Sequence, residues 1–161
     1  MNADDVCNLT TLMTDIDWDD DSNNERWCHE QRSVAAAYME AQPVGFGQLG
    51  DWPAWHIAPD VSIWAIESLK APGKVGWWVI CGDLPTDYAS GENTPHPRIA
   101  VGVFAKRWAQ LAASMERGED PASFSIGTLE CADELIPLLK SRARLLSEWV
   151  SDDSVWQDKA Q

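Results

Sequence analysis

Basic residues are scarce in this chain. It has 12 Lys and Arg against 26 Asp and Glu, which gives a formal net charge of −14. A protein that binds nucleic acid neutralises phosphates with a basic face, so this balance argues against a nucleic-acid partner. An acidic surface favours basic protein partners instead.

Long apolar runs and paired cysteines are also missing. No apolar run is long enough to cross a bilayer, and the N-terminus shows no basic-then-apolar leader. The four cysteines are widely spaced and include no C-x-x-C pair, which indicates a reducing compartment. We therefore expect a cytoplasmic protein that does not associate with membranes.

Sequence signatures of enzymes and cofactor sites are weak or absent. Residues 45–50 spell G-x-G-x-x-G, but they follow a predicted helix instead of a strand. Cys81 lacks the glycines of a nucleophile elbow and is expected to be a buried, inert thiol. Cys28, His29 and Glu30 are adjacent on a predicted helix, so their side chains diverge and do not share one metal ion. We expect no cofactor and no metal, and we lean toward a non-enzymatic function.

Acids and tryptophans dominate what is present. Residues 1–25 carry eight acids and no Lys or Arg, which predicts an acidic, partly flexible segment over residues 1–21. A single domain is predicted over 22–156, followed by a tail at 157–161. Ten tryptophans are enough to supply both a core and an interface. Trp18, among these acids, is either a packing anchor or a contact for a basic partner, and packing is the commoner use.

A first helix is predicted from Ser22 to about Gln42. Ser22 and Glu25 fit a capping box, and Pro43 ends the run. Apolar residues recur on one face at spacings of three and four, so we expect this face to be buried. It consists of Trp27, Gln31, Val34, Ala35, Tyr38 and Met39.

A second helix is predicted to begin near Thr94, which caps it, and to end before Gly118. Its apolar stripe is more typical of a core than of a cofactor pocket. The stripe consists of Val101, Phe104, Trp108, Leu111 and Met115.

The final helix is predicted to begin at about Thr128 or Asp133 and to end at Val150. Pro137 falls in its first turn if Asp133 is the cap, and kinks the helix otherwise. The face expected to be buried consists of Leu135, Leu138, Leu139, Arg142, Leu145, Leu146 and Trp149.

Three short extended runs lie between the first two helices, at residues 54–58, 62–69 and 75–84. Turn sequences at 59–60 and 71–74 connect them, which favours antiparallel pairing. Residues 83–88 are expected to leave the sheet as a polar corner. The predicted fold is therefore α+β, with a small antiparallel sheet of about three strands packed with three main helices.

The sheet region carries a recognisable pattern: I-W-A-I-E-S at residues 63–68, G-W-W-V-I at 76–80 and G-D-L-P-T-D-Y at 82–88. It resembles a bacterial family of small cytoplasmic proteins known as a domain of unknown function, over roughly residues 50–156. The resemblance implies family membership and carries over no catalytic residues.

Carboxylates at a strand end are one way to hold a general base or a bound group. The candidates are Asp83 and Asp87, with Glu67 nearby, and His96 and Arg98 would complete the site at a helix N-terminus that binds an anion. Asp residues in such corners more often cap backbone N–H groups. A small enzyme or anionic-ligand binder built on Asp83, Asp87, His96 and Arg98 is the alternative hypothesis.

The leading hypothesis is a non-enzymatic acidic interaction protein, such as an immunity or inhibitor protein that binds a basic toxin or enzyme. Neighbouring Trp77 and Trp78 must point to opposite faces of a strand. A tryptophan that points outward among acids is typical of a hot spot for a basic partner. The candidate binding residues are Trp18, Trp52, Trp55, Asp83, Asp87 and Tyr88.

Overall fold

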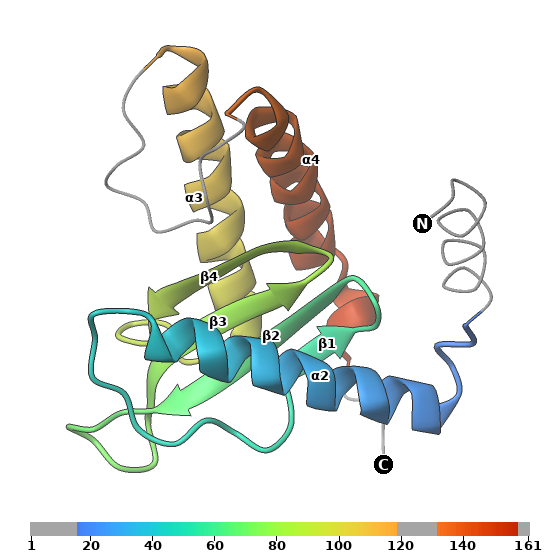
Figure 1. Cartoon of the computed structure of the whole chain (residues 1–161), viewed down its shortest axis with the longest axis vertical. Helices are drawn as coiled ribbons and strands as arrows, with labels where there is room; N and C mark the ends of the chain where they lie inside the picture. The colour runs from blue at the N-terminus through green and yellow to red at the C-terminus, as the bar shows by residue number, and fades with distance from the viewer. Residues whose placement is uncertain (1–15, 119–131, 158–161) are drawn as a thin grey trace, which may run out of the picture.

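The computed structural model describes residues 16–118 and 132–157 (Figure 1). Within these residues, three long helices combine with one four-stranded antiparallel sheet of order β1-β2-β3-β4. The α+β prediction is confirmed, and the predicted count of about three strands is one short. In chain order the elements are α2 (Asp21–Glu40), β1 (Trp55–Ile57), β2 (Val61–Glu67), β3 (Val75–Gly82), β4 (Leu84–Ser90), α3 (Pro97–Glu116), α4 (Ala132–Ser151) and the short 3-10 helix η3 (Asp153–Trp156).

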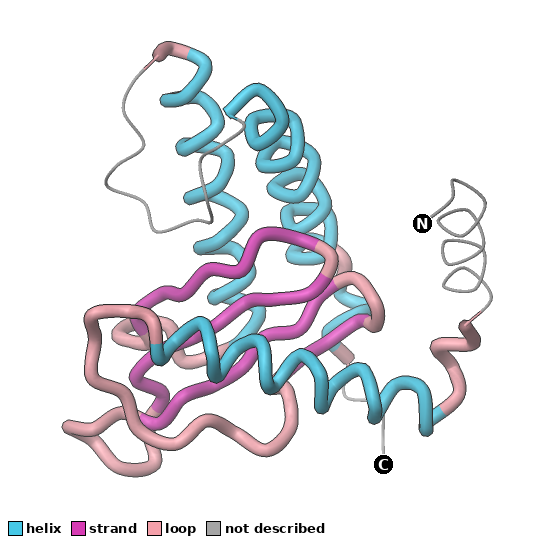
Figure 2. Tube along the Cα trace, in the orientation of Figure 1, coloured by secondary structure: helices cyan, strands magenta, loops and turns pink. Residues whose placement is uncertain are grey.

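Helices cover both faces of the sheet. In Figures 1 and 2, α2 crosses one face, while α3 and α4 pack side by side on the other and extend beyond the sheet. Each face has its own apolar core. Ile63, Trp78 and Ile80 pack toward α3 and α4, whereas Trp64 and Val79 pack toward α2. Strands buried on both faces read as continuous apolar runs, which explains why β2 and β3 show no alternation with polar residues.

The fourth strand was not predicted. Residues 84–90 pair with β3 in the register Val79↔Tyr88 and Ile80↔Asp87, so the prediction of a polar corner at 83–88 is wrong for these residues. The strand lies at the sheet edge, where Pro85 is tolerated because its missing N–H is not needed by a neighbour. Gly82 has φ +144°, and a Cβ there would approach the Asp60 carbonyl oxygen to 2.5 Å. Glycine is therefore required where β3 turns into β4.

The start of α2 differs from the predicted capping box. The Asp20 carboxylate accepts hydrogen bonds from the backbone N–H groups of Ser22, at 2.9 Å, and Asn23, at 3.3 Å. Asp20 is thus the N-cap, and the helix begins at Asp21. Val34, which was expected on the buried face, is 42% exposed. The rest of that face is largely correct, with Trp27, Ala35 and Met39 buried.

The N-cap of α3 is His96, not Thr94. The His96 Nδ1 accepts from the Arg98 backbone N–H at 3.0 Å, and Pro97 occupies the first helical position. Thr94 is buried, and its carbonyl accepts from the Trp78 Nε1 at 2.7 Å. Gly118, with φ +75°, follows the helix end as predicted. All five residues of the predicted apolar stripe are buried.

Helix α4 spans Ala132–Ser151 and contains Pro137 at its sixth position. Because the helix begins before Asp133, Pro137 lies beyond the first turn, and the alternative in which Asp133 is the cap does not apply. Pro137 is exposed. Thr128 lies outside the described residues. On the packed face Leu139 and Leu146 are buried as expected, but Leu138 is 37% exposed, and the small Ala143 takes the place between the two leucines. Among the described helices, none combines the length and apolar character needed to span a membrane.

Candidate functional site

Asp87 is a buried carboxylate on β4 that faces α3. It is 2% exposed and accepts from the Trp108 Nε1 at 3.0 Å and from the Tyr88 backbone N–H at 2.8 Å. The Arg107 Nη1 lies 3.3 Å from both carboxylate oxygens and also donates to the Tyr88 carbonyl at 2.7 Å. Arg107 therefore neutralises the buried charge and caps a backbone carbonyl of the edge strand at the same time.

Burial shifts the pKa values of two ionisable groups in this region, Asp87 and Tyr38. Removal from water raises the pKa of the Asp87 carboxyl above its ordinary range, and Arg107 and the Trp108 N–H oppose the shift. Burial also raises the pKa of the Tyr38 hydroxyl, and the Asp87 charge adds to that effect. The buried Asp87 carboxylate, with both oxygens already accepting hydrogen bonds, lacks the free lone pair and open access that a general base needs.

Asp83 lies at the turn between β3 and β4 and is exposed. Its carbonyl accepts from the Arg142 Nε at 2.8 Å, and its carboxylate lies 3.4 Å from the Arg142 Nη2. Its backbone N–H donates to the Asp60 carbonyl at 2.9 Å. Burial raises the pKa of Asp60, and the Asp83 charge raises it further, against Arg142. Asp83 thus connects two turns of the sheet to α4.

His96 and Arg98 occupy the first turn of α3. His96 serves as the cap described above, so its Nδ1 is occupied by the Arg98 N–H. The Arg98 Nε and Nη2 both donate to the Val150 carbonyl at the end of α4, at 2.9 and 2.7 Å. The same Nη2 pairs with the Asp153 carboxylate at 2.7 Å. The Arg98 guanidinium also lies over the Trp156 ring, 5.8 Å from its centroid.

The structure does not bring these four candidates into one cluster. Asp87 is held at Arg107, nine residues along α3 from Arg98, which corresponds to a rise of about 13 Å. Asp83 is held at Arg142, eight residues along α4 from the Val150 carbonyl that binds Arg98, or about 12 Å. Each charged group has its own structural partner. Glu67, at the end of β2, is exposed and belongs to none of these contacts.

The buried thiols are held in structural contacts. Cys81 is fully buried, and its Sγ lies 3.3 Å from the Ser62 hydroxyl, which also accepts from the Trp64 Nε1 at 2.9 Å. Burial raises the pKa of Cys81 to about 11, and burial likewise raises that of Cys28 to about 11. A thiol with a raised pKa is a poor nucleophile and a poor metal ligand at neutral pH.

Four rings form a contiguous row at the N-terminal end of α2. The centroid distances are 6.4 Å from Trp18 to Trp27, 6.3 Å from Trp27 to His56, and 5.6 Å from His56 to Trp52. The His56 Nε2 is 2.7 Å from the Asn24 Oδ1, which fixes the imidazole against α2. We call Trp18, Trp27, His56 and Trp52 the aromatic row. It joins residues from the lead-in to α2, from α2 itself, and from the segment at the start of β1.

Trp52 is the open end of the aromatic row. It is 48% exposed, and no other Trp, Tyr or Phe within 16–118 and 132–157 is classed as exposed. Exposed acids flank both ends of the row in sequence, and we call them the acidic rim: Asp17, Asp19, Asp20, Asp21 and Asp51. No Lys or Arg lies between residues 16 and 25, Arg26 follows directly, and Arg32 lies 3.8 Å from the Asp51 carboxylate. This end of the molecule therefore combines an aromatic surface with negative charge.

The two remaining predicted binding residues have structural contacts. The Trp55 Nε1 donates to the Val155 carbonyl at 2.8 Å, and its ring stacks on Trp156 with centroids 4.1 Å apart. Trp55 therefore fastens η3 to the sheet. Tyr88 faces α2, is half-buried, and contacts the rings of Tyr38 and Trp77 at 5.9 and 5.4 Å.

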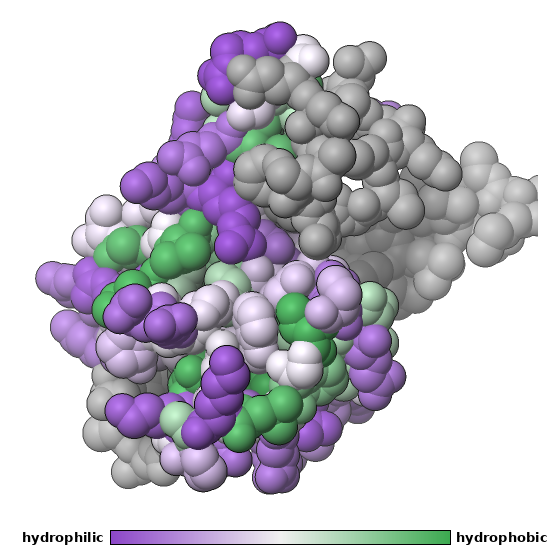
Figure 3. Space-filling view, turned by 90° about the vertical axis from the view of Figure 1, so that its left-hand side faces the viewer, coloured by the Kyte–Doolittle hydropathy of each residue, from purple (hydrophilic) through white to green (hydrophobic). Residues whose placement is uncertain are grey.

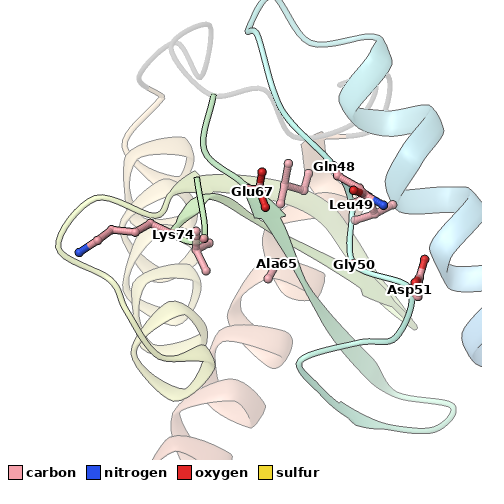
Figure 4. Close-up of a pocket in the computed structure, with 10 residues that line it drawn as sticks. Gln48, Leu49, Gly50, Asp51, Ala65, Glu67 and Lys74 are labelled. Carbon is pink, nitrogen blue, oxygen red and sulfur yellow. The ribbon is translucent and has the colours of Figure 1, made fainter. Parts of the chain in front are cut away.

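A shallow pocket of about 280 Å³ lies between the loop at 48–51 and the β2–β3 hairpin (Figure 4). Leu49, Ala65 and Val75 contribute its apolar lining. In Figure 4 the Lys74 side chain extends away from Asp51, so the charged groups do not converge on a common point. No set of three or more His, Cys, Asp and Glu in the described part of the chain is grouped so that it could hold a metal ion.

Apolar side chains also reach the surface elsewhere. Figure 3 shows hydrophobic groups in separate patches over the lower half of one face, with hydrophilic groups between them. Leu69, on the β2–β3 hairpin, is 67% exposed, and Ile99, on α3, is 48% exposed. Single exposed aliphatic side chains are normal on protein surfaces. The aromatic row differs because four rings are in contact and one of them is open to solvent.

Trp18 and Trp52 were predicted from the sequence as binding residues, whereas the two residues that connect them, Trp27 and His56, were not. Trp27 was assigned to a helix face, and His56 to a strand. Arg107 was not placed beside Asp87, because the two residues lie on different elements. A cue for the aromatic row was present in the close succession of Trp52, Trp55 and His56 after Asp51.

Comparison with known proteins yields one match. A family model described as "Domain of unknown function (DUF4826)" matches residues 21–156. No curated protein and no solved structure matches the chain. The matched range begins with α2 and ends with η3, so it includes Trp27, His56 and Trp52 of the aromatic row.

Proposed function

The chain belongs to the family described as domain of unknown function (DUF4826), and because that description assigns no activity, we propose from the residues themselves that it is a non-enzymatic interaction protein. Its partner is a basic protein, and its role is that of an immunity or inhibitor protein toward a basic toxin or enzyme. Trp52, the open end of the aromatic row, and the acidic rim supply the binding surface.

The observation that carries this proposal is the exposure of Trp52 beside the acidic rim. Tryptophan is enriched among the residues that contribute most of the binding free energy at protein interfaces. An exposed tryptophan is one that a partner can reach. Asp51, next in sequence to Trp52, has a side chain that is 94% exposed. An exposed indole and an exposed carboxylate on adjacent residues provide apolar contact and charge for the same partner.

Charge supports the same partner class. The formal net charge of −14 produces a field that steers basic proteins toward this chain and repels acidic ones. The charged candidates of the strand-to-helix region do not compete as a binding surface, since Asp87 is buried and Arg98 is occupied by Val150 and Asp153.

The proposal is tested by direct binding to basic proteins, beginning with toxins or enzymes encoded beside the gene. We expect saturable binding by biolayer interferometry, with an association rate that falls steeply as salt rises. The triple variant Asp17→Asn, Asp21→Asn, Asp51→Asn should weaken the binding affinity about tenfold or more, because it removes three negative charges from the site. Inhibition of the bound enzyme by the chain would establish the immunity or inhibitor role.

A matched control separates the site from the overall charge. Glu40, Glu92 and Glu148 are exposed acids outside the acidic rim. Their replacement by Gln removes the same number of negative charges from other parts of the surface. This control should reduce association only modestly. Absence of saturable binding to any basic protein, or an equal loss in both triple variants, would count against the proposal.

A further inference from the structure

We propose that the open end of the aromatic row binds an arginine side chain of the partner, with the guanidinium stacked on Trp52 and paired with Asp51. This rests on the proposed function and adds the chemistry of recognition. The occupant is an exposed, arginine-bearing segment of a basic protein.

The chain already contains one arginine site of this construction. The Arg98 guanidinium lies over the Trp156 ring at 5.8 Å and pairs with the Asp153 carboxylate at 2.7 Å. Its Nε and Nη2 also donate to the Val150 carbonyl. One indole face, one carboxylate and one carbonyl therefore satisfy one guanidinium. Asp153 and Trp156 are close in sequence, on the same turn of η3.

Asp51 and Trp52 are adjacent in sequence and both exposed, so they offer the same two kinds of group, a carboxylate and an indole. The structure places a guanidinium over Trp156 and over Phe104, and over the described residues none lies above Trp52. Trp52 makes an edge-to-face contact with another ring, His56, at an interplanar angle of 90°. This contact orients the indole while 48% of the residue stays exposed.

Arg32 is the cation beside Asp51, and its guanidinium is hydrogen-bonded to two backbone carbonyls. Its Nε donates to the Gly50 carbonyl at 2.9 Å and its Nη2 to the Leu49 carbonyl at 3.1 Å. The same Nη2 lies 3.8 Å from the Asp51 carboxylate, whose side chain is 94% exposed. An exposed pair at this distance is weak. Arg32 therefore holds the loop in place and leaves the carboxylate open to a second cation.

The geometry favours arginine over lysine. A guanidinium is planar and weakly hydrated, so it stacks on an indole and donates to a carboxylate at the same time. An ammonium is a strongly hydrated point charge that loses more solvation in the same place. The acidic rim attracts both cations equally, because Coulomb attraction depends only on charge and distance. Trp52 should supply most of the discrimination between the two, because a hydrogen-bonded pair with an exposed carboxylate such as Asp51 is weak for either cation.

The test uses the full chain and two fluorescently labelled peptides, in which glycine alternates with six arginines or with six lysines. We expect fluorescence anisotropy at low salt to show tighter binding of the arginine peptide. Trp52→Ala should weaken the arginine peptide about 3- to 30-fold, the range for one cation–π contact. It should change the lysine peptide less, so that the preference disappears. Trp52→Phe should retain part of the preference because a smaller ring still offers a π face.

Ile99→Ala is the matched control, since Ile99 is also 48% exposed but lies on α3. It should change neither affinity. Equal binding of the two peptides, or an arginine preference that survives Trp52→Ala, would overturn the arginine assignment. If the peptides behave in this way while a basic protein still binds and depends on the acidic rim, the proposed function stands and only this inference fails. Failure of the chain to bind either peptide also rejects it.

Discussion

The carboxylates of Asp87 and Asp51 occupy opposite environments in one small fold. Asp87 is 2% exposed and accepts from Trp108, Arg107 and the Tyr88 backbone. The Asp51 side chain is 94% exposed and has one distant partner, Arg32, at 3.8 Å. The alternative hypothesis from the sequence placed a catalytic or ligand-binding site in the region around Asp87. The side chains there are instead hydrogen-bonded to one another and to the backbone. The exposed groups, Asp51 and Trp52, lie near β1, at the opposite edge of the sheet from β4.

This difference separates residues that maintain the structure from residues free to bind. A buried charge persists only where partners replace the water it has lost, and those partners leave it no capacity for a ligand. An exposed indole with an exposed acid beside it has the reverse balance. Neither group contributes much to the free energy of folding, so both are free to contact a partner.

The largest effect expected is on stability, from two tryptophan truncations. Trp108→Ala should destabilise the fold by about 3–5 kcal/mol, because it leaves a cavity in the core and removes the Nε1 donor of Asp87. Trp52→Ala should change the unfolding free energy by less than about 1 kcal/mol, since half of the side chain is already in water. Urea unfolding followed by circular dichroism measures both. Similar costs for the two variants would erase the distinction between the regions.

A smaller effect is expected from Asp87→Asn, and it should depend on pH. Burial raises the pKa of Asp87 in the folded state, so the folded protein binds a proton more tightly than the unfolded chain does. The stability that this group contributes is fully present below its ordinary pKa, about 4, and is lost as the pH rises through the raised value. Asn cannot titrate, so the variant lacks this dependence.

The destabilisation caused by Asp87→Asn should therefore be about 1–3 kcal/mol near pH 4 and smaller at pH 7.5. Unfolding curves of both proteins across this range give the difference, in which all other carboxyl groups cancel. Asp51→Asn, which changes an exposed acid, should show no such trend. A destabilisation that grows toward neutral pH would mean that the Arg107 pair outweighs burial.

Much of the fold could be predicted from the sequence, because local patterns define it. The apolar runs of β2 and β3, the stripe of α3 and the glycine after it all follow from periodicity and backbone preference. The caps were harder. Asp20 and Ser22 are both good N-cap residues two positions apart, and His96 is a less common cap than Thr94. Strand β4 reads as a turn, since its polar residues and Pro85 are typical of both turns and edge strands.

The candidate site depends on contacts that no local pattern encodes. Asp87 and Arg107 are twenty residues apart and meet only because α3 packs on β4. The aromatic row joins positions 18, 27, 52 and 56 through the packing of α2 against the start of β1. Composition indicated that some tryptophans reach the surface. Which ones do so is a property of the tertiary structure.

The smallest effect expected is at Asp83, an exposed residue of the predicted site. Its carboxylate contact with Arg142 is 3.4 Å long with a side chain 74% exposed, whereas the Asp83 carbonyl holds the same arginine at 2.8 Å. Asp83→Asn keeps the carbonyl contact, so stability should change by less than about 0.5 kcal/mol. The Asp83 charge is one cause of the raised pKa of Asp60, and the substitution should lower that pKa, as measured by carboxyl NMR titration. Glu92→Gln, which removes an exposed acid elsewhere, is the control. An unchanged Asp60 titration would mean that the Asp83 charge does not act on Asp60. A loss of several kcal/mol would mean that the Asp83 carboxylate has a structural role that its exposed position does not indicate.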